Sequence, residues 1–271
     1  MNPLPIISDL NSDLLEGPVF DSKESLLYFV SILDFLVFCY NPSTGEVLSV
    51  KLDSPVSCVF LLDQKRVMVA TKNGFFKVDF NTLQKQLAFQ MDIPDFVRYN
   101  DGIRDSEGRF IIGTMGFPVI KDHIGKVFSY SEGTYKVIIE NTTISNGLVF
   151  SQDGFTLYFV DSPTKKVAKY AYNKDTGDVL FLSYVITFMG ESIPDGMCMD
   201  NEGMLWIAEY GGGCVSRWNP ENGQRIEERK LPCPNVTSCC LDNNLNLYVT
   251  TAKSNIKDDK YGGRLFYIEL N

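Results

Sequence analysis

Histidine is nearly absent from this sequence: His123 is the only one among 271 residues. A histidine-based zinc site, a Ser-His-Asp triad and a Cys-His dyad all depend on histidine, so all three lack support. A serine or cysteine nucleophile paired with another base stays open. The single histidine lies in a polar stretch, and we expect it to be an exposed loop residue rather than a catalyst.

Long apolar runs and an excess of basic residues are also missing. No apolar run approaches the roughly 20 residues that a membrane helix needs. The formal net charge is -9 and the isoelectric point is about 4.7. Because an acidic surface binds phosphate groups poorly, we expect neither nucleic acid nor a membrane as a partner. Residues 1–16 place no basic segment before an apolar one, so we expect no secretory signal.

The cysteines are few, and their spacing does not indicate disulfide pairs. There are seven, an odd number, and no two have the CxxC spacing. Most lie in apolar, strand-like stretches, which favours buried free thiols over disulfides. Free thiols are typical of a reducing compartment, so we expect a cytoplasmic protein.

One short strand pattern is present six times. The second residue of the pattern recurs after 40, 43, 47, 48 and 42 residues. Tight-turn sequences such as Asp105-Ser106-Glu107-Gly108 precede most copies, and a further strand pattern follows each copy. The six copies are Leu27–Val30, Val67–Ala70, Phe110–Gly113, Leu157–Val160, Leu205–Ala208 and Leu247–Thr250. Three to four strands per repeat of roughly 45 residues predict an all-β fold, a six-bladed β-propeller of four-stranded antiparallel blades.

The spacing of the copies leaves no room for a linker, so we expect a single domain over residues 1–271. We expect the N-terminal segment Leu4–Leu10 to complete the last blade, because closing the ring removes exposed sheet edges. The stretches Ile186–Ile193 and Glu209–Gly213 are expected to be loops. Trp206 is expected to lie in the core of a blade.

Four of the six units open their innermost strand with an acidic or amide residue next to glycine. These openers are Glu16-Gly17, Asp101-Gly102 with Asn100 before it, Asn146-Gly147 and Asp195-Gly196, whereas the other two units have Ser57-Cys58 and Thr237-Ser238. Each pair alone is more often a turn. Innermost strands line the channel of a propeller, so four openers at one register predict a shared site at one mouth.

Glu16, Asn146 and Asp195 would supply two carboxylates and one amide oxygen to this site. Carboxylates that face each other in a channel repel, and a bound cation removes that cost. Ligands that are all oxygen favour calcium, magnesium or manganese, with zinc and iron as alternatives. Arg98 is either a surface charge or a channel cation able to hold a substrate oxygen.

These motifs resemble those of the gluconolactonase, regucalcin (senescence marker protein) and luciferin-regenerating enzyme family, over nearly the full length of the chain. The matching stretches are Glu16–Asp21, Arg98–Gly102 with Gly113–Met115, Ser145–Leu148, Pro194–Met197 and Val236–Ser238. The resemblance implies a six-bladed propeller with one divalent metal ion, calcium being favoured, on Glu16, Asn146 and Asp195. It also implies that Arg98 and Asn100 orient the substrate.

The typical reaction of that family is the hydrolysis of sugar lactones to aldonic acids. We therefore expect a metal-dependent lactonase that acts on a small lactone or related ester, with Asp195 as the general base. Members related to regucalcin have an acidic residue shortly after the Gly-Thr-Met segment. Here Gly116–Ile120 contains none, which favours a less polar ring.

Three alternatives stay open at this point. The first is an ester hydrolase similar to the paraoxonase propellers. The second is a calcium-binding or scaffolding protein without enzymatic activity. The third is an enzyme that acts on a thiazoline or nitrile-derived compound.

Overall fold

The structure is a computed structural model that describes residues 3–256 and 259–270. Strands dominate the fold, and the one helix within those ranges is the short 3-10 helix η1 (Ser162–Thr164). The described residues contain no helix with the length and apolarity that crossing a bilayer requires.

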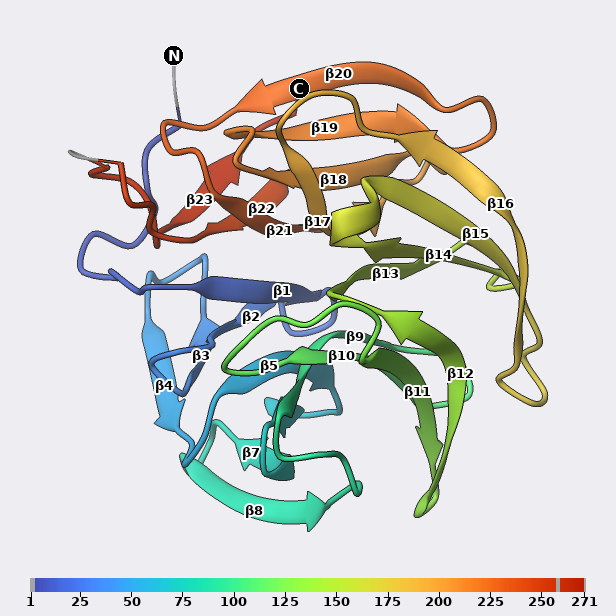
Figure 1. Cartoon of the computed structure of the whole chain (residues 1–271). Coiled ribbons are helices and arrows are strands. Elements are labelled where there is room, and N and C mark those ends of the chain that lie inside the picture. Colours follow the sequence, from blue (N-terminus) through green and yellow to red (C-terminus); the bar gives the residue numbers. More distant parts are fainter. Residues whose placement is uncertain (1–2, 257–258, 271) are drawn as a thin grey trace.

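The strands form six antiparallel blades arranged in a ring, as the sequence predicts (Figure 1). The inner strands are β1 (Leu15–Asp21), β5 (Val56–Leu61), β9 (Val97–Arg104), β13 (Ser145–Phe150), β17 (Ile193–Met199) and β21 (Val236–Leu241). The second strands are β2 (Leu26–Ser31), β6 (Arg66–Thr71), β10 (Phe110–Gly116), β14 (Thr156–Asp161), β18 (Leu205–Tyr210) and β22 (Leu247–Thr251). The third strands are β3 (Leu36–Tyr40), β7 (Gly74–Asp79), β11 (Gly125–Ser131), β15 (Lys166–Tyr172), β19 (Cys214–Asn219) and β23 (Leu265–Ile268). The outer strands are β4 (Val47–Lys51), β8 (Gln84–Phe89), β12 (Thr134–Thr142), β16 (Val179–Thr187) and β20 (Gln224–Lys230).

The sixth blade closes the ring differently from the other five. Its sheet has three strands, β21, β22 and β23, whereas each other blade has four. The N-terminal segment takes the outer place through one isolated bridge, Pro5 to Phe266, and a hydrogen bond from the Ile6 N–H to the Leu265 carbonyl (3.0 Å). The predicted closure by residues 4–10 is therefore present as a single bridge rather than as a full strand.

Burial increases toward the middle strands of each blade. All six residues of β2 are buried, whereas most of β20 is exposed. Trp206 lies in the core between the fifth and sixth blades, as predicted. The seven cysteines are all free and six of them are buried, which also agrees with the sequence.

Two predicted loops need correction. Glu209 and Tyr210 are the last two residues of strand β18 instead of lying in a loop. The buried carboxylate of Glu209 accepts hydrogen bonds from Ser192, Ser216 and Arg225, which hold it in place. The predicted loop from Ile186 to Ile193 is shorter than expected, since its ends belong to β16 and β17.

Candidate functional site at one mouth of the channel

A β-bulge interrupts each inner strand near its start, at the position of the predicted openers. In β9, Asn100 and Asp101 together face a single residue of β10, and in β17 Asp195 and Gly196 together face a single residue of β18. Glu16 and Asn146 directly precede the bulges of β1 and β13. A bulge bends the strand and redirects its side chains. The repeated bulge therefore turns these polar side chains toward one end of the channel.

Two of the neighbouring glycines let the inner strands approach one another closely. A Cβ atom on Gly147 would lie 2.6 Å from the Asp195 carbonyl oxygen, and one on Gly196 would lie 2.0 Å from the Ser238 hydroxyl. Real Cβ atoms do not make contacts this short, so a larger residue at either position would push the strands apart. Both glycines are thus needed to bring Asn146 and Asp195 together.

Hydrogen bonds link the site residues across three blades. Arg98 Nη1 donates to Asn100 Oδ1 (2.6 Å), and Asn100 Nδ2 donates to Asn146 Oδ1 (2.6 Å). Asn146 Nδ2 donates to the Ser162 hydroxyl (2.9 Å), which donates to the Pro194 carbonyl (2.7 Å). Four of the five predicted site residues, Arg98, Asn100, Asn146 and Asp195, are buried. The chain of bonds fixes the orientation of both amides.

The carboxylates of the site lack comparable partners. Asp195 is 7% exposed, and its Oδ1 atom is buried without any hydrogen-bond partner. Burial, with the nearby charges of Glu16 and Asp101, raises the pKa of Asp195 well above its ordinary value. Burial and the charge of Asp101 raise the pKa of Glu16 to about 8. Without a cation, the site therefore retains protons near neutral pH.

Among the described residues, Arg98 is the basic side chain whose positive charge opposes these negative charges. Burial lowers its pKa to about 10, and the charges of Glu16 and Asp195 oppose this. The guanidinium group therefore stays protonated at neutral pH. It lies 6.0 Å from the ring centre of Phe117, in the stretch after Gly116 that lacks an acidic residue.

The donor set fits a hard divalent cation. In the described part of the chain, no three His, Cys, Asp or Glu side chains form a metal-binding group, so the amide of Asn146 is considered as a third donor. Asn146 Oδ1 uses one of its two lone pairs to accept from Asn100 and keeps the other. With the unpartnered Asp195 Oδ1 and the Glu16 carboxylate, this gives two carboxylates and one amide oxygen.

Three further residues at this mouth had no predicted role. Asp101 was grouped with the openers, and the structure places its charge near Glu16 and Asp195; burial raises the pKa of Asp101 to about 6. Ser162 follows β14 and orients Asn146. Burial is the main cause of the raised pKa of Tyr210, and the charges of Asp195 and Glu16 add to it. Ser162 comes beside Asn146 only when β13 pairs with β14, and Tyr210 comes near Glu16 only when the ring closes, so no local motif could have identified them.

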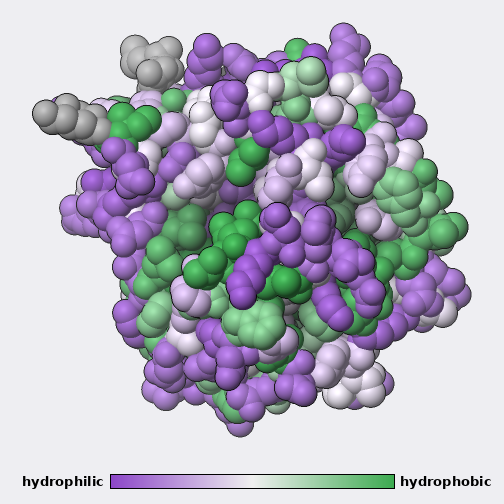
Figure 2. Space-filling view, viewed as in Figure 1, coloured by the Kyte–Doolittle hydropathy of each residue, from purple (hydrophilic) through white to green (hydrophobic). Residues whose placement is uncertain are grey.

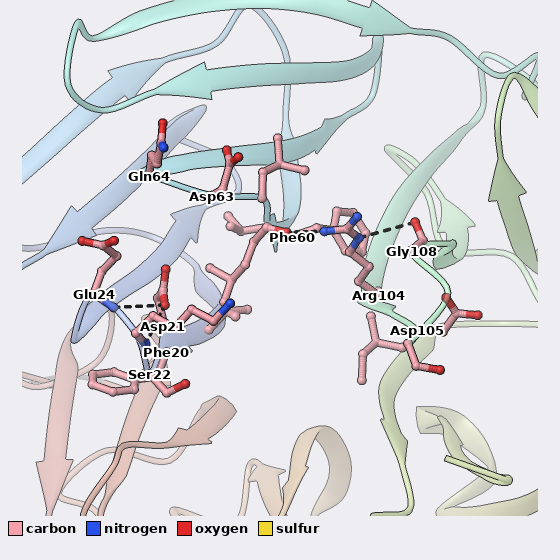
Figure 3. A pocket seen from close by; sticks show the side chains of 18 of the residues that line it. Phe20, Asp21, Ser22, Glu24, Phe60, Asp63, Gln64, Arg104, Asp105 and Gly108 are labelled. Carbon is pink, nitrogen blue, oxygen red and sulfur yellow. Dashed lines mark hydrogen bonds between the residues drawn. The ribbon is translucent and has the colours of Figure 1, made fainter. Parts of the chain in front are cut away.

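A pocket with a volume of about 810 Å³ lies at the opposite ends of three inner strands (Figure 3). It is lined by the ends of β1, β5 and β9 and by the turns that follow them, and its lining includes Asp21, Asp63 and Arg104. The carboxylate of Asp21 accepts hydrogen bonds from the N–H groups of Lys23 (2.9 Å) and Glu24 (3.2 Å), in an ordinary turn. Asp21 already has hydrogen-bond partners, whereas the buried Asp195 Oδ1 at the other mouth has none, so we place the functional site at that mouth.

Comparison with known proteins identifies the family of this chain. A family profile described as "SMP-30/Gluconolactonase/LRE-like region" matches residues 14–253. The chain belongs to this SMP-30/gluconolactonase/LRE-like family. A regucalcin from Xenopus laevis is 36% identical over 254 residues, which is 90% of this chain and 85% of the relative.

Solved structures similar to this family member share its fold. A luciferin-regenerating enzyme has a TM-score of 0.89 at 24% identity, covering 98% of this chain and 95% of the other. A calcium-binding protein, regucalcin, from Agrobacterium tumefaciens has a TM-score of 0.90 at 24% identity, with coverages of 99% and 93%. A gluconolactonase from Xanthomonas campestris has a TM-score of 0.79 at 19% identity, with coverages of 98% and 88%.

Proposed function

We propose that this protein is a metal-dependent lactonase that opens a small lactone to its hydroxy acid at the mouth of the channel formed by Glu16, Asn146 and Asp195. The observation that carries the proposal is the buried, unpartnered Oδ1 atom of Asp195, beside two further carboxylates. A module that only binds other proteins would gain nothing from such a group, because an unsatisfied buried carboxylate costs stability. Membership of a family that includes gluconolactonases supports the same reaction class.

Glu16, Asn146 and Asp195 would hold the cation. When bound, a divalent ion would offset the repulsion among these carboxylates, polarise the lactone carbonyl and lower the pKa of a water molecule. Calcium suits the all-oxygen donors, with magnesium, manganese, zinc and iron as alternatives.

Asp195 is the proposed general base. Its ionised carboxylate accepts the proton of the water whose oxygen attacks the lactone carbonyl carbon. The bond between that carbon and the ring oxygen then breaks, and Asp195 returns the proton to the ring oxygen. Arg98 stabilises the charge that develops on the carbonyl oxygen, and Asn100 orients the ring.

The rim of the site favours a lactone of low polarity. Phe117 faces the guanidinium of Arg98, and the following Val119 and Ile120 are largely exposed. These side chains cannot hydrogen-bond the hydroxyl groups of a sugar. A substrate with an apolar ring or side chain would instead bury part of this surface. We therefore expect simple γ- or δ-lactones with alkyl groups to be turned over faster than sugar lactones.

The test is hydrolysis of a panel of sugar and alkyl lactones by metal-stripped protein, with each divalent ion added back. Acid release at constant pH measures turnover. Ion-restored turnover supports the proposal and identifies both the ion and the ring type. Asp21→Asn is a matched control for Glu16→Gln, because Asp21 lies on the same strand but lines the pocket at the far end. We expect only Glu16→Gln to lose activity.

A calcium-binding protein without enzymatic activity is the second candidate, since the same oxygen donors would serve it. Tight ion binding without turnover of any lactone or ester would favour this candidate. Turnover of aryl esters alone would instead indicate an ester hydrolase.

A further inference from the structure

The five outer strands of the ring differ sharply in their surface chemistry. Strands β4, β8 and β12 each carry at least one charged residue, and β20 carries five, whereas the nine residues of β16 carry none. Charged side chains on an edge strand discourage pairing with another chain. Strand β16 is the one outer strand of the described blades without this protection.

Strand β16 also exposes the most apolar surface. Each other outer strand has one exposed large hydrophobic side chain, namely Val47, Leu87, Tyr135 or Ile226. Strand β16 has four: Leu180 is 67% exposed, Phe181 47%, Leu182 49% and Tyr184 53%. Phe155, 58% exposed, lines a surface pocket together with Leu180 and extends this surface. We call these five side chains the β16 patch, and Figure 2 shows green surface at the right-hand rim, where Figure 1 draws β16.

Two bulges explain why neighbouring residues of β16 are exposed together. The register with β15 shifts once near Leu182 and once near Val185. A bulge breaks the alternation of side chains and interrupts the ladder of hydrogen bonds. The β16 patch is therefore suited to side-chain packing rather than to the addition of a continuous strand. Phe181 and Tyr184 already pack edge to face, with ring centres 5.2 Å apart, which gives the patch a defined shape.

The charge of the molecule points to a second copy of this chain as the occupant. At a net charge of -9, two copies repel each other over most of their surface. The side chains of the β16 patch are uncharged, and charges of both signs border it. Lys166 lies 4.7 Å from the Tyr184 ring and Lys174 lies 4.1 Å from the Phe155 ring. Asp175 and Asp178 line the pocket beside Phe155, so the borders of two copies can pair lysine with aspartate. Electrostatic repulsion between two identical copies is therefore weakest when they meet at the β16 patch.

The area of the patch agrees with a weak dimer. Five side chains of this size, each about half exposed, offer roughly 100 Å² apiece. Two copies would then bury about 1,000 Å² in total, which is close to the lower limit for a specific interface. We propose that the β16 patch is the contact through which two copies of this chain form a two-fold symmetric, concentration-dependent dimer. This proposal is independent of the activity at the channel mouth.

Sedimentation velocity over a concentration series reaching the high micromolar range tests this inference. We expect the average mass of the wild-type protein to rise from 30.6 kDa toward twice that value. Leu182→Lys places two lysines in the contact and should weaken association at least about tenfold. Ile226→Lys is the matched control, since Ile226 is 47% exposed on the outer strand of the next blade. It should associate as the wild type does.

Three results would overturn the inference. One is a wild-type protein that stays monomeric at every concentration. Another is equal association by the Leu182→Lys and Ile226→Lys variants. The third is growth into assemblies larger than two copies, because a two-fold contact closes after two. Thermal unfolding followed by circular dichroism checks that each variant is folded, and Tyr184→Lys replaces Leu182→Lys if that variant is not.

Discussion

Asp195 and Asp200 lie five residues apart at opposite ends of β17, and both are 7% exposed, yet their surroundings differ completely. Asp200 Oδ1 accepts hydrogen bonds from the N–H groups of Glu202 (2.9 Å) and Met204 (3.0 Å), and Oδ2 pairs with Arg217 Nε (2.7 Å). Asp195 Oδ1 has no partner. Burial costs a carboxylate the same at either end, but only Asp200 is compensated within the chain.

The same contrast recurs on β9. Asp105, just past the end of that strand, accepts hydrogen bonds from Arg109 and from the hydroxyl of Tyr172 (2.5 Å). Asp101, within the strand, accepts one from the Gly102 N–H, and burial raises its pKa to about 6. We infer that one end of the channel is built for stability and that the other retains uncompensated charge for function.

The largest expected effect is the loss of activity in Asp195→Asn. Removing a general base typically lowers turnover about 10³-fold. The melting temperature should stay the same or rise, because the change removes the cost of protonating or burying a carboxyl group whose Oδ1 atom lacks a partner. Lactone turnover and thermal unfolding of the same sample measure both effects. An Asp195→Asn variant with wild-type turnover would refute the assignment of the base.

Asp200→Asn should show the reverse behaviour. Arg217 would lose its buried partner, so we expect the free energy of unfolding to fall by about 3 kcal/mol. Turnover per folded molecule should change little, because Asp200 lies at the far end of β17. Denaturant titration alongside the activity assay separates the two quantities. If Asp195→Asn and Asp200→Asn lose activity and stability to the same extent, the proposed difference between the two ends of the channel is wrong.

The stability of the metal-stripped protein should decrease as the pH rises. Below pH 4.5, the ordinary pKa of glutamate, Glu16 is protonated in the folded and unfolded states alike. Between pH 4.5 and about 8, the unfolded chain has lost this proton and the folded protein still holds it, so stability falls through this range. Each tenfold difference in proton affinity is worth about 1.4 kcal/mol.

A divalent ion should reverse this loss, and most strongly at the upper end of the range. Denaturant titrations at several pH values, with and without the ion, provide the measurement. If the stability of the metal-stripped protein rises between about pH 5 and about pH 8, the predicted direction is wrong.

The smallest effect is expected for Ser162→Ala. The Ser162 hydroxyl accepts a hydrogen bond from Asn146 Nδ2 and thereby helps to fix the amide oxygen that faces the site. Removing such a supporting bond typically weakens metal binding by about tenfold. Calorimetric titration of the ion into both proteins tests this. Unchanged affinity would mean that the bond from Asn100 alone orients Asn146.

The ring and its mouth could be predicted from the sequence because both repeat. Six strand patterns at nearly constant spacing determine the blades, and the position of Glu16, Asn146 and Asp195 at the start of their units follows from the same register. The role of Glu209 could not be predicted, because its partners Ser192 and Arg225 lie in other strands and loops. Ser162 has the same difficulty, since it contacts Asn146 only once two neighbouring strands pair.

The exposed surface of β16 also escaped prediction. Its sequence has the apolar character of a core strand, and only the position of the strand at the rim of the ring leaves Leu180 and Leu182 exposed. The blade order decides this, and local sequence does not. The bulges within the inner strands were likewise invisible until the register with their neighbours was known.

Proton release on ion binding tests the central claim most directly. The claim is that Glu16 and Asp195 hold protons in the metal-free site because Arg98 compensates only part of their charge. Calorimetric titration of calcium near a pH of about 7, in buffers with different ionisation enthalpies, counts the protons released. We predict about one or more protons per ion for the wild type and fewer for Asp195→Asn. Ion binding without proton release, or no binding of any divalent ion, would contradict the account.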